Sequence, residues 1–221
     1  MATAADNTGL TVAYAQPRDV LHRLGTDALD QVEQARAARM SNKTRHEHFV
    51  AGRALLRHLL STATANTVQP TEWQFVNGAH GKPVVKPGLP QLHFSISHAD
   101  GLVAVAISPA GQLGIDLELV TGARDSSPTV DQLTDREQAW LHQHGEAERW
   151  PAFLKLWTAK EAVSKATGLG CGVDFRNIEV DVQAGRARCP DNLLDTGNHM
   201  DFDQQTIEAH GATYCLSTAC L

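Results

Sequence analysis

Acidic side chains carry the clearest chemical potential in this sequence. Residues 111–118 read Gly-Gln-Leu-Gly-Ile-Asp-Leu-Glu, and a β-strand here places Asp116 and Glu118 on one face. At a separation of about 7 Å, two carboxylates repel by roughly 2 kcal/mol at an effective dielectric constant of about 20. The pair is therefore either fully solvated, as on an exposed strand face, or holds a cation.

A second stretch, residues 157–165, reads Trp-Thr-Ala-Lys-Glu-Ala-Val-Ser-Lys and predicts a helix. Glu161 and Lys165 lie one turn apart in it, which spacing alone explains as a solvated surface pair. Joined to the two strand carboxylates, Glu161 would instead complete an all-oxygen ligand set of the kind that Mg²⁺ prefers. Lys160 and Lys165 would then suit a phosphate beside the ion.

Composition limits the class of protein. The chain has 221 residues, 42% of them apolar, which suits one large domain or two small halves. Its net charge of −6 argues against a general nucleic-acid binder. No apolar run reaches the length of a membrane span, and residues 1–15 do not have the pattern of a secretory signal. We expect no nucleic-acid or membrane partner.

The cysteines show no C-x-x-C spacing, and a chain of this size needs no disulfide for stability. Reduced, packed thiols are therefore expected, in a cytoplasmic protein. The positions concerned are Cys171, Cys189, Cys215 and Cys220.

The order of the predicted elements indicates two similar α+β halves. In the first half, helical patterns are followed by a short strand and a hairpin, and a strand at 113–119 comes next. After a connector at 121–130, the second half again has helices before strands. The predicted helices are 29–40, 43–60, 134–145 and 151–167, the last of them stopped by Gly168 and Gly170, and the strands include 10–15, 73–76, 92–96, 102–107, 178–182, 202–208 and 214–220.

Five blocks in this order resemble the Sfp-type 4′-phosphopantetheinyl transferases, and the resemblance covers most of the chain. They are Gly-Arg-Ala-Leu-Leu-Arg at 52–57, Gly-Lys-Pro at 81–83, Phe-Ser-Ile-Ser-His at 94–98, Gly-Ile-Asp-Leu-Glu at 114–118 and the stretch at 157–168. The resemblance implies an α+β fold, a pseudo-twofold monomer of two similar halves. Each half would be a small antiparallel sheet with packed helices. Residues 1–112 would contact the phosphates of coenzyme A, and residues 113–221 would carry the metal-binding carboxylates and the catalytic helix.

The activity that the resemblance implies is transfer of the 4′-phosphopantetheine arm of coenzyme A to a serine of an acyl or peptidyl carrier protein domain. The products are a loaded carrier and 3′,5′-ADP, and the ion is Mg²⁺, with Mn²⁺ as the alternative. Carriers of fatty acid, polyketide, nonribosomal peptide and siderophore pathways all fit. Two other functions stay open: a coenzyme A or nucleotide-binding module without turnover, and a Mg²⁺-dependent phosphohydrolase.

Residue roles follow from the same resemblance. Asp116, Glu118 and Glu161 would bind the metal, with Glu161 also the general base and Lys165 a phosphate contact. Coenzyme A contacts would come from Arg53, Lys82, Ser97, His98, Lys160 and Lys165.

Two signals are less specific. Glu137 follows Thr134 at the spacing of a helix capping box, so a place near the metal and a purely structural role are both open. The other histidines, including His46 and His48, show no ligand spacing, because residues two apart on a helix do not share a face. A serine hydrolase is not indicated at Ser97, because the chain has no G-x-S-x-G elbow.

Overall fold

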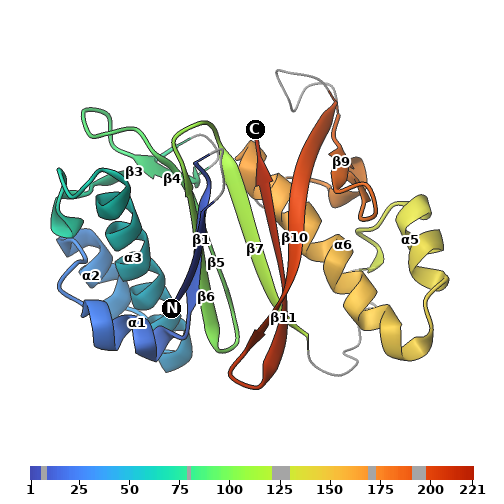
Figure 1. The fold of residues 1–221 in the computed structure, drawn as a ribbon, viewed down its shortest axis with the longest axis horizontal. Helices are drawn as coiled ribbons and strands as arrows, with labels where there is room; N and C mark the ends of the chain where they lie inside the picture. The colour runs from blue at the N-terminus through green and yellow to red at the C-terminus, as the bar shows by residue number, and fades with distance from the viewer. Residues whose placement is uncertain (6–8, 79–80, 121–129, 169–172, 191–197) are drawn as a thin grey trace. The chain divides into compact units, whose positions relative to one another are not determined.

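The computed structural model describes residues 1–5, 9–78, 81–120, 130–168, 173–190 and 198–221 (Figure 1). Two compact units divide the chain, Met1–Gln112 and Leu113–Leu221. Each unit combines an antiparallel sheet with a long helix, so the predicted α+β class is confirmed.

The main sheet of the first unit has four antiparallel strands in the order β1-β2-β6-β5. A separate hairpin pairs the short strands β3 and β4. β6 lies between β2 and β5, and every one of its residues is buried, so side chains on both of its faces are covered. The strands are β1 (Ala2–Ala5), β2 (Thr11–Ala15), β3 (Phe75–Asn77), β4 (Pro83–Val85), β5 (His93–Ala99) and β6 (Leu102–Ser108).

The helix α3 (Lys43–Ala63) lies along one face of this sheet (Figure 1). The helices α1 (Pro17–Leu24) and α2 (Gln31–Ala38) and the turn η1 (Pro70–Glu72) pack against α3. α3 begins at the cap Asn42, whose side chain accepts a hydrogen bond from the amide of Arg45. It buries leucines such as Leu55 and Leu56 against the inward residues of β6, Val103 and Val105. This apolar core fixes which face of α3 meets the sheet.

The second unit has a five-stranded antiparallel sheet in the order β7-β11-β10-β9-β8, which makes β7 an edge strand. The chain reaches β11 only after the helices and β8–β10, yet β11 pairs with β7 along eight residues. The strands are β7 (Leu113–Val120), β8 (Glu179–Asp181), β9 (Arg186–Arg188), β10 (His199–Ala209) and β11 (Ala212–Cys220).

The long helix α6 (Glu146–Thr167) lies along one face of this sheet, with α5 (Asp135–His142) packed against it and the turn η4 (Phe175–Asn177) following (Figure 1). Gly168 ends α6 in the left-handed conformation, as predicted. The helix starts earlier than predicted, at Glu146, so Pro151 lies inside it, where it cannot donate a hydrogen bond to the preceding turn.

Several other expectations need correction or lie outside the described residues. The strand predicted at 10–15 is β2, and β1 pairs with its outer side. The strand predicted at 92–96 extends further, so that Ser97 and His98 also belong to β5. Cys189 and Cys215 are buried thiols, but Cys220 is exposed. Positions 121–129, Gly170 and Cys171 fall outside the described residues. Within the described ranges, no helix has the length and apolar character that a bilayer crossing requires.

Candidate active site

A glycine brings α6 onto the acidic strand. A Cβ atom at Gly114 would lie 1.8 Å from the carbonyl oxygen of Ala162 and 2.6 Å from the amide nitrogen of Ala166. The helix backbone therefore sits directly on β7 at this residue. Because side chains alternate along a strand, Asp116 and Glu118 lie on this helix-facing side. The face is thus not the exposed one that a solvated pair would need, and Asp116 is only 5% exposed.

Lys165 joins the two elements. Its ammonium donates to Oδ1 of Asp116 at 2.6 Å and to the backbone oxygen of Ile115 at 3.1 Å. Glu161 stands one turn earlier on α6, and its pKa is raised, first by burial and then by the negative charge of Asp116, against the opposing effect of Lys165. The structure therefore brings Asp116, Glu161 and Lys165 into one electrostatically coupled group.

Glu118 occupies the neighbouring position on the same face of β7, opposite Cys215 of β11. Burial raises the pKa of the Cys215 thiol, a hydrogen bond with Thr158 opposes that effect, and the charges of Asp116 and Glu118 add to it. Both carboxylates therefore lie close enough to the Cys215 thiol on β11 to raise its pKa.

This group suits a hard divalent cation by its chemistry. Its donors are carboxylate oxygens, the ligands that Mg²⁺ and Mn²⁺ accept. The pKa of Glu161 is raised by burial and then by the negative charge of Asp116, and a cation between the two carboxylates would offset both effects. In the described part of the chain, no three acidic, histidine or cysteine side chains are already gathered as a metal cluster. The strand-borne Asp116 is instead held by the ammonium of Lys165.

Lys160 and Glu137 form an ion pair inside the second unit. Lys160 is fully buried, and its ammonium pairs with Oε2 of Glu137 at 2.7 Å and donates to the backbone oxygens of Phe175 and Ile178. An ammonium has three protons, and these three acceptors use them all. Lys160 was expected to contact coenzyme A, and the structure places its ammonium inside the second unit with these three acceptors.

Glu137 is the other half of this buried pair. It completes the capping box with Thr134, accepting from the Thr134 amide at 2.8 Å, and its Oε1 accepts from the amide of Val180 at 2.7 Å. One carboxylate thus ties the start of α5 to α6 and to β8. Of the two roles left open for Glu137, the structure favours the structural one over catalysis.

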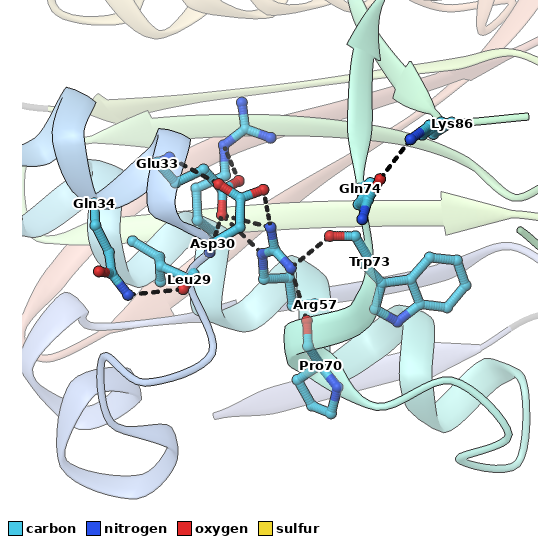
Figure 2. Close-up of polar contacts among 10 residues, drawn as sticks. Leu29, Asp30, Glu33, Gln34, Arg57, Pro70, Trp73, Gln74 and Lys86 are labelled. Atoms are coloured by element: carbon cyan, nitrogen blue, oxygen red, sulfur yellow. Dashed lines mark hydrogen bonds and ion pairs between the residues drawn. The ribbon is translucent and has the colours of Figure 1, made fainter.

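In the first unit, α3 carries two arginines with unlike surroundings. Arg57 is fully buried and pairs with Asp30 and Glu33, each at 2.8 Å, while it also donates to the backbone oxygens of Pro70 and Trp73 (Figure 2). All of these contacts hold α2 and η1 to α3, so Arg57 is structural.

Arg53, one turn before Arg57, lines a cavity of about 500 Å³ between α2, α3 and the β3–β4 hairpin. Its guanidinium lies over the rings of Phe49 and Phe75 and 3.5 Å from Oε1 of Glu33. Its buried Nη1 donates no hydrogen bond within the described residues. Arg53 is therefore placed to meet an anion that enters this cavity.

A second basic hollow, of about 610 Å³, lies on α2 and the start of α3. Its cations are Arg36, Arg39 and Arg45, and its apolar members include Val32 and Met40.

The remaining coenzyme candidates lie on β5 and the hairpin. The backbone oxygen of Lys82 closes the β3–β4 turn by accepting from the amide of Gly78 at 2.8 Å. The pKa of His93 is lowered mainly by burial and further by the positive charge of the Lys82 side chain. Ser97 is buried and the adjacent His98 exposed, because consecutive strand residues point to opposite faces. The structure therefore does not place Ser97 and His98 side by side on one face.

The sequence alone does not identify His48 as a neighbour of His98. The ring of His48, on α3, stacks on the ring of His98 with a centroid distance of 5.2 Å and an interplanar angle of 17°. The two positions are fifty residues apart, so no local spacing in the sequence could reveal the pair.

Comparison with known proteins identifies the family. A sequence profile of the 4′-phosphopantetheinyl transferase superfamily matches residues 112–219. The chain is 32% identical to the 4′-phosphopantetheinyl transferase HetI of Nostoc, over 70% of this chain and 65% of that protein, slightly less than two thirds of its length. It is 32% identical to the 4′-phosphopantetheinyl transferase pptA of Paxillus involutus, over 74% of this chain and 68% of the fungal protein. With AcpT of Salmonella typhimurium, also a 4′-phosphopantetheinyl transferase, identity is 29% over 73% and 78% of the two chains. The chain belongs to the 4′-phosphopantetheinyl transferase superfamily.

Proposed function

We propose that this protein transfers the 4′-phosphopantetheine arm of coenzyme A to a serine of an acyl or peptidyl carrier protein domain, releases 3′,5′-ADP and requires Mg²⁺. Family membership supports the general reaction. The observation that carries the proposal for this chain is the coupled group of Asp116, Glu161 and Lys165 between β7 and α6. It offers acidic ligands for a divalent ion and a cation for a diphosphate, the two requirements of phosphoryl-type transfer.

Asp116, Glu118 and Glu161 would hold the metal ion. When bound, the ion would neutralise the diphosphate of coenzyme A and the charge that develops on the leaving nucleotide. Lys165 is partly exposed, so its ammonium can reach a phosphate oxygen in place of Asp116.

The nucleophile would be the carrier serine, and Glu161 would accept its proton. A carboxylate oxygen of Glu161, next to Asp116 and Lys165, would take the proton from the hydroxyl during attack on the β-phosphate. The serine oxygen then forms the new bond to phosphorus, and the bond from that phosphorus to the nucleotide breaks.

Arg53, Lys82, Ser97 and His98 are the proposed contacts to the coenzyme A phosphates. The support for Arg53 is its cavity, and for His98 its exposure at the end of β5. Lys160 and Glu137 have no part in this proposal, because their charges form a buried ion pair inside the second unit.

The test is to incubate the protein with an apo carrier domain, coenzyme A and Mg²⁺ and to measure the intact mass of the carrier. A gain of one phosphopantetheine supports the proposal. Coenzyme A binding without a mass gain would indicate a binding module, and nucleotide release without carrier modification would indicate a phosphohydrolase. Asp116→Ala and Glu161→Ala should each abolish the mass gain, and full activity in either variant would refute the site.

A further inference from the structure

The stacking of His48 on His98 follows from how α3 meets β5. On β5, the alternate residues Ile96 and His98 face the helix. On α3, Gly52 lies against Ile96: a Cβ at Gly52 would be 3.3 Å from Cγ2 of Ile96. His48 is one helical turn before Gly52, and His98 is two strand residues beyond Ile96. The same helix–strand contact therefore brings the two imidazoles together.

The two rings differ in their access to solvent. His48 is 7% exposed, whereas His98 is exposed. Burial lowers the pKa of His48, while the nearby carboxylates of Asp100 and Glu47 act to raise it. The inner ring of the stack is therefore favoured as a neutral aromatic surface, and the outer ring is the one that an incoming anion can meet.

We propose that His48 is a positioning residue for His98: its buried ring holds the outer imidazole in the orientation in which a phosphate group of coenzyme A is bound. The proposal rests on the proposed function, in which His98 contacts such a phosphate. A flat ring stacked beneath His98 limits the orientations that the outer imidazole can take. His48 thus acts through His98 rather than on the substrate.

Two substitutions separate this role from simple packing. His48→Ala removes the ring, whereas His48→Phe keeps a flat aromatic surface of similar size without a titrating group. His46→Ala is the matched control, because His46 lies on the same helix two residues earlier and so faces another direction. Thermal unfolding checks that each variant is folded.

The readouts are the dissociation constant of coenzyme A, measured by calorimetry, and the kcat and KM of the carrier-loading reaction. We expect His48→Ala to weaken coenzyme A binding by about twofold to tenfold, the cost of ordering one side chain on binding. Its kcat and its KM for the carrier should stay within about twofold of wild type, as expected when only ground-state coenzyme A binding is lost. His48→Phe should restore most of the affinity, and His46→Ala should match wild type.

The inference is overturned if His48→Ala binds coenzyme A as wild type does. It is also overturned if His48→Phe loses as much affinity as His48→Ala, or if kcat falls together with thermal stability while affinity is unchanged. Wild-type protein that binds coenzyme A without loading a carrier would refute the proposed function, while the binding series would still decide the role of His48. Wild-type protein that does not bind coenzyme A would refute both.

Discussion

Replacing Gly114 by alanine tests whether α6 must sit directly on β7. The new Cβ would lie 1.8 Å from the carbonyl oxygen of Ala162, whereas ordinary van der Waals contacts begin at 3.4 Å. The helix would have to retreat by roughly the difference, about 1.6 Å. The three nearest atoms are the carbonyl oxygen and carbon of Ala162 and the amide nitrogen of Ala166, and all belong to the helix backbone, so no side-chain rotation can relieve the overlap.

The expected cost in unfolding free energy is about 3 kcal/mol or more, the upper end of what overpacked cores show. The retreat would also separate Glu161 and Lys165, which α6 carries, from Asp116 on the strand. Since a 1 Å misplacement of reacting groups can cost about a hundredfold in rate, carrier loading should fall by at least that factor.

Urea unfolding followed by fluorescence, together with the intact-mass assay of the carrier, measures both effects. Gly52→Ala is the matched control, because its Cβ would meet only the end of the Ile96 side chain, at 3.3 Å. Alanine also favours a helix over glycine by about 1 kcal/mol, so this variant should stay within about 1 kcal/mol of wild type. A Gly114→Ala protein with wild-type stability and rate would refute the argued seating of α6.

Three further predictions concern buried charges. The pKa of Glu161 is raised on folding, so ionisation of this carboxyl destabilises the fold as pH rises above the ordinary glutamate pKa of about 4.3. Glu161→Gln should therefore be more stable than wild type at about pH 8 and equally stable at about pH 3. Equal urea midpoints of the two proteins at both pH values would contradict this. Lys160→Met and Glu137→Gln should each cost about 3–5 kcal/mol, with the double variant costing clearly less than the sum in a double-mutant cycle; strict additivity would refute the pair. Arg57→Met should lose about 3–5 kcal/mol of stability, measured by thermal unfolding. Arg53→Met should cost less stability but weaken coenzyme A binding, measured by calorimetry. If Arg53→Met costs more stability and Arg57→Met weakens binding more, the two roles are exchanged.

The sequence predicts the acidic strand well, because the alternation in Gly-Ile-Asp-Leu-Glu reports a local geometry. It could not predict which face was covered. Gly114 was a signal of close backbone approach within a strand, but its partner, the Ala162 carbonyl, lies forty-eight residues away. The small strand β1 was missed because its four residues, Ala-Thr-Ala-Ala, carry little β-propensity and no clear apolar alternation.

Residue roles on helices were harder to predict than the helices themselves. α6 is buried on most sides, so helical spacing could not tell that Lys160 points into the core while Lys165 reaches Asp116. Arg53 and Arg57 share a face by spacing, yet only Arg57 is saturated, because the carbonyls of Pro70 and Trp73 are brought to it by tertiary packing. The capping role of Glu137 was readable from Thr134, but its ion pair with Lys160 was not.

The ammonium of Lys165 on Asp116 has a consequence for handling and for ligand order. The protein supplies its own counterion to this carboxylate, so the fold of the ligand-free enzyme should survive chelators such as EDTA. A divalent ion arriving alone must compete with that tethered cation, whereas an ion accompanied by a diphosphate offers the lysine a new anion in exchange. Under the proposed function, joint arrival of metal and coenzyme would therefore be the favoured route into the site.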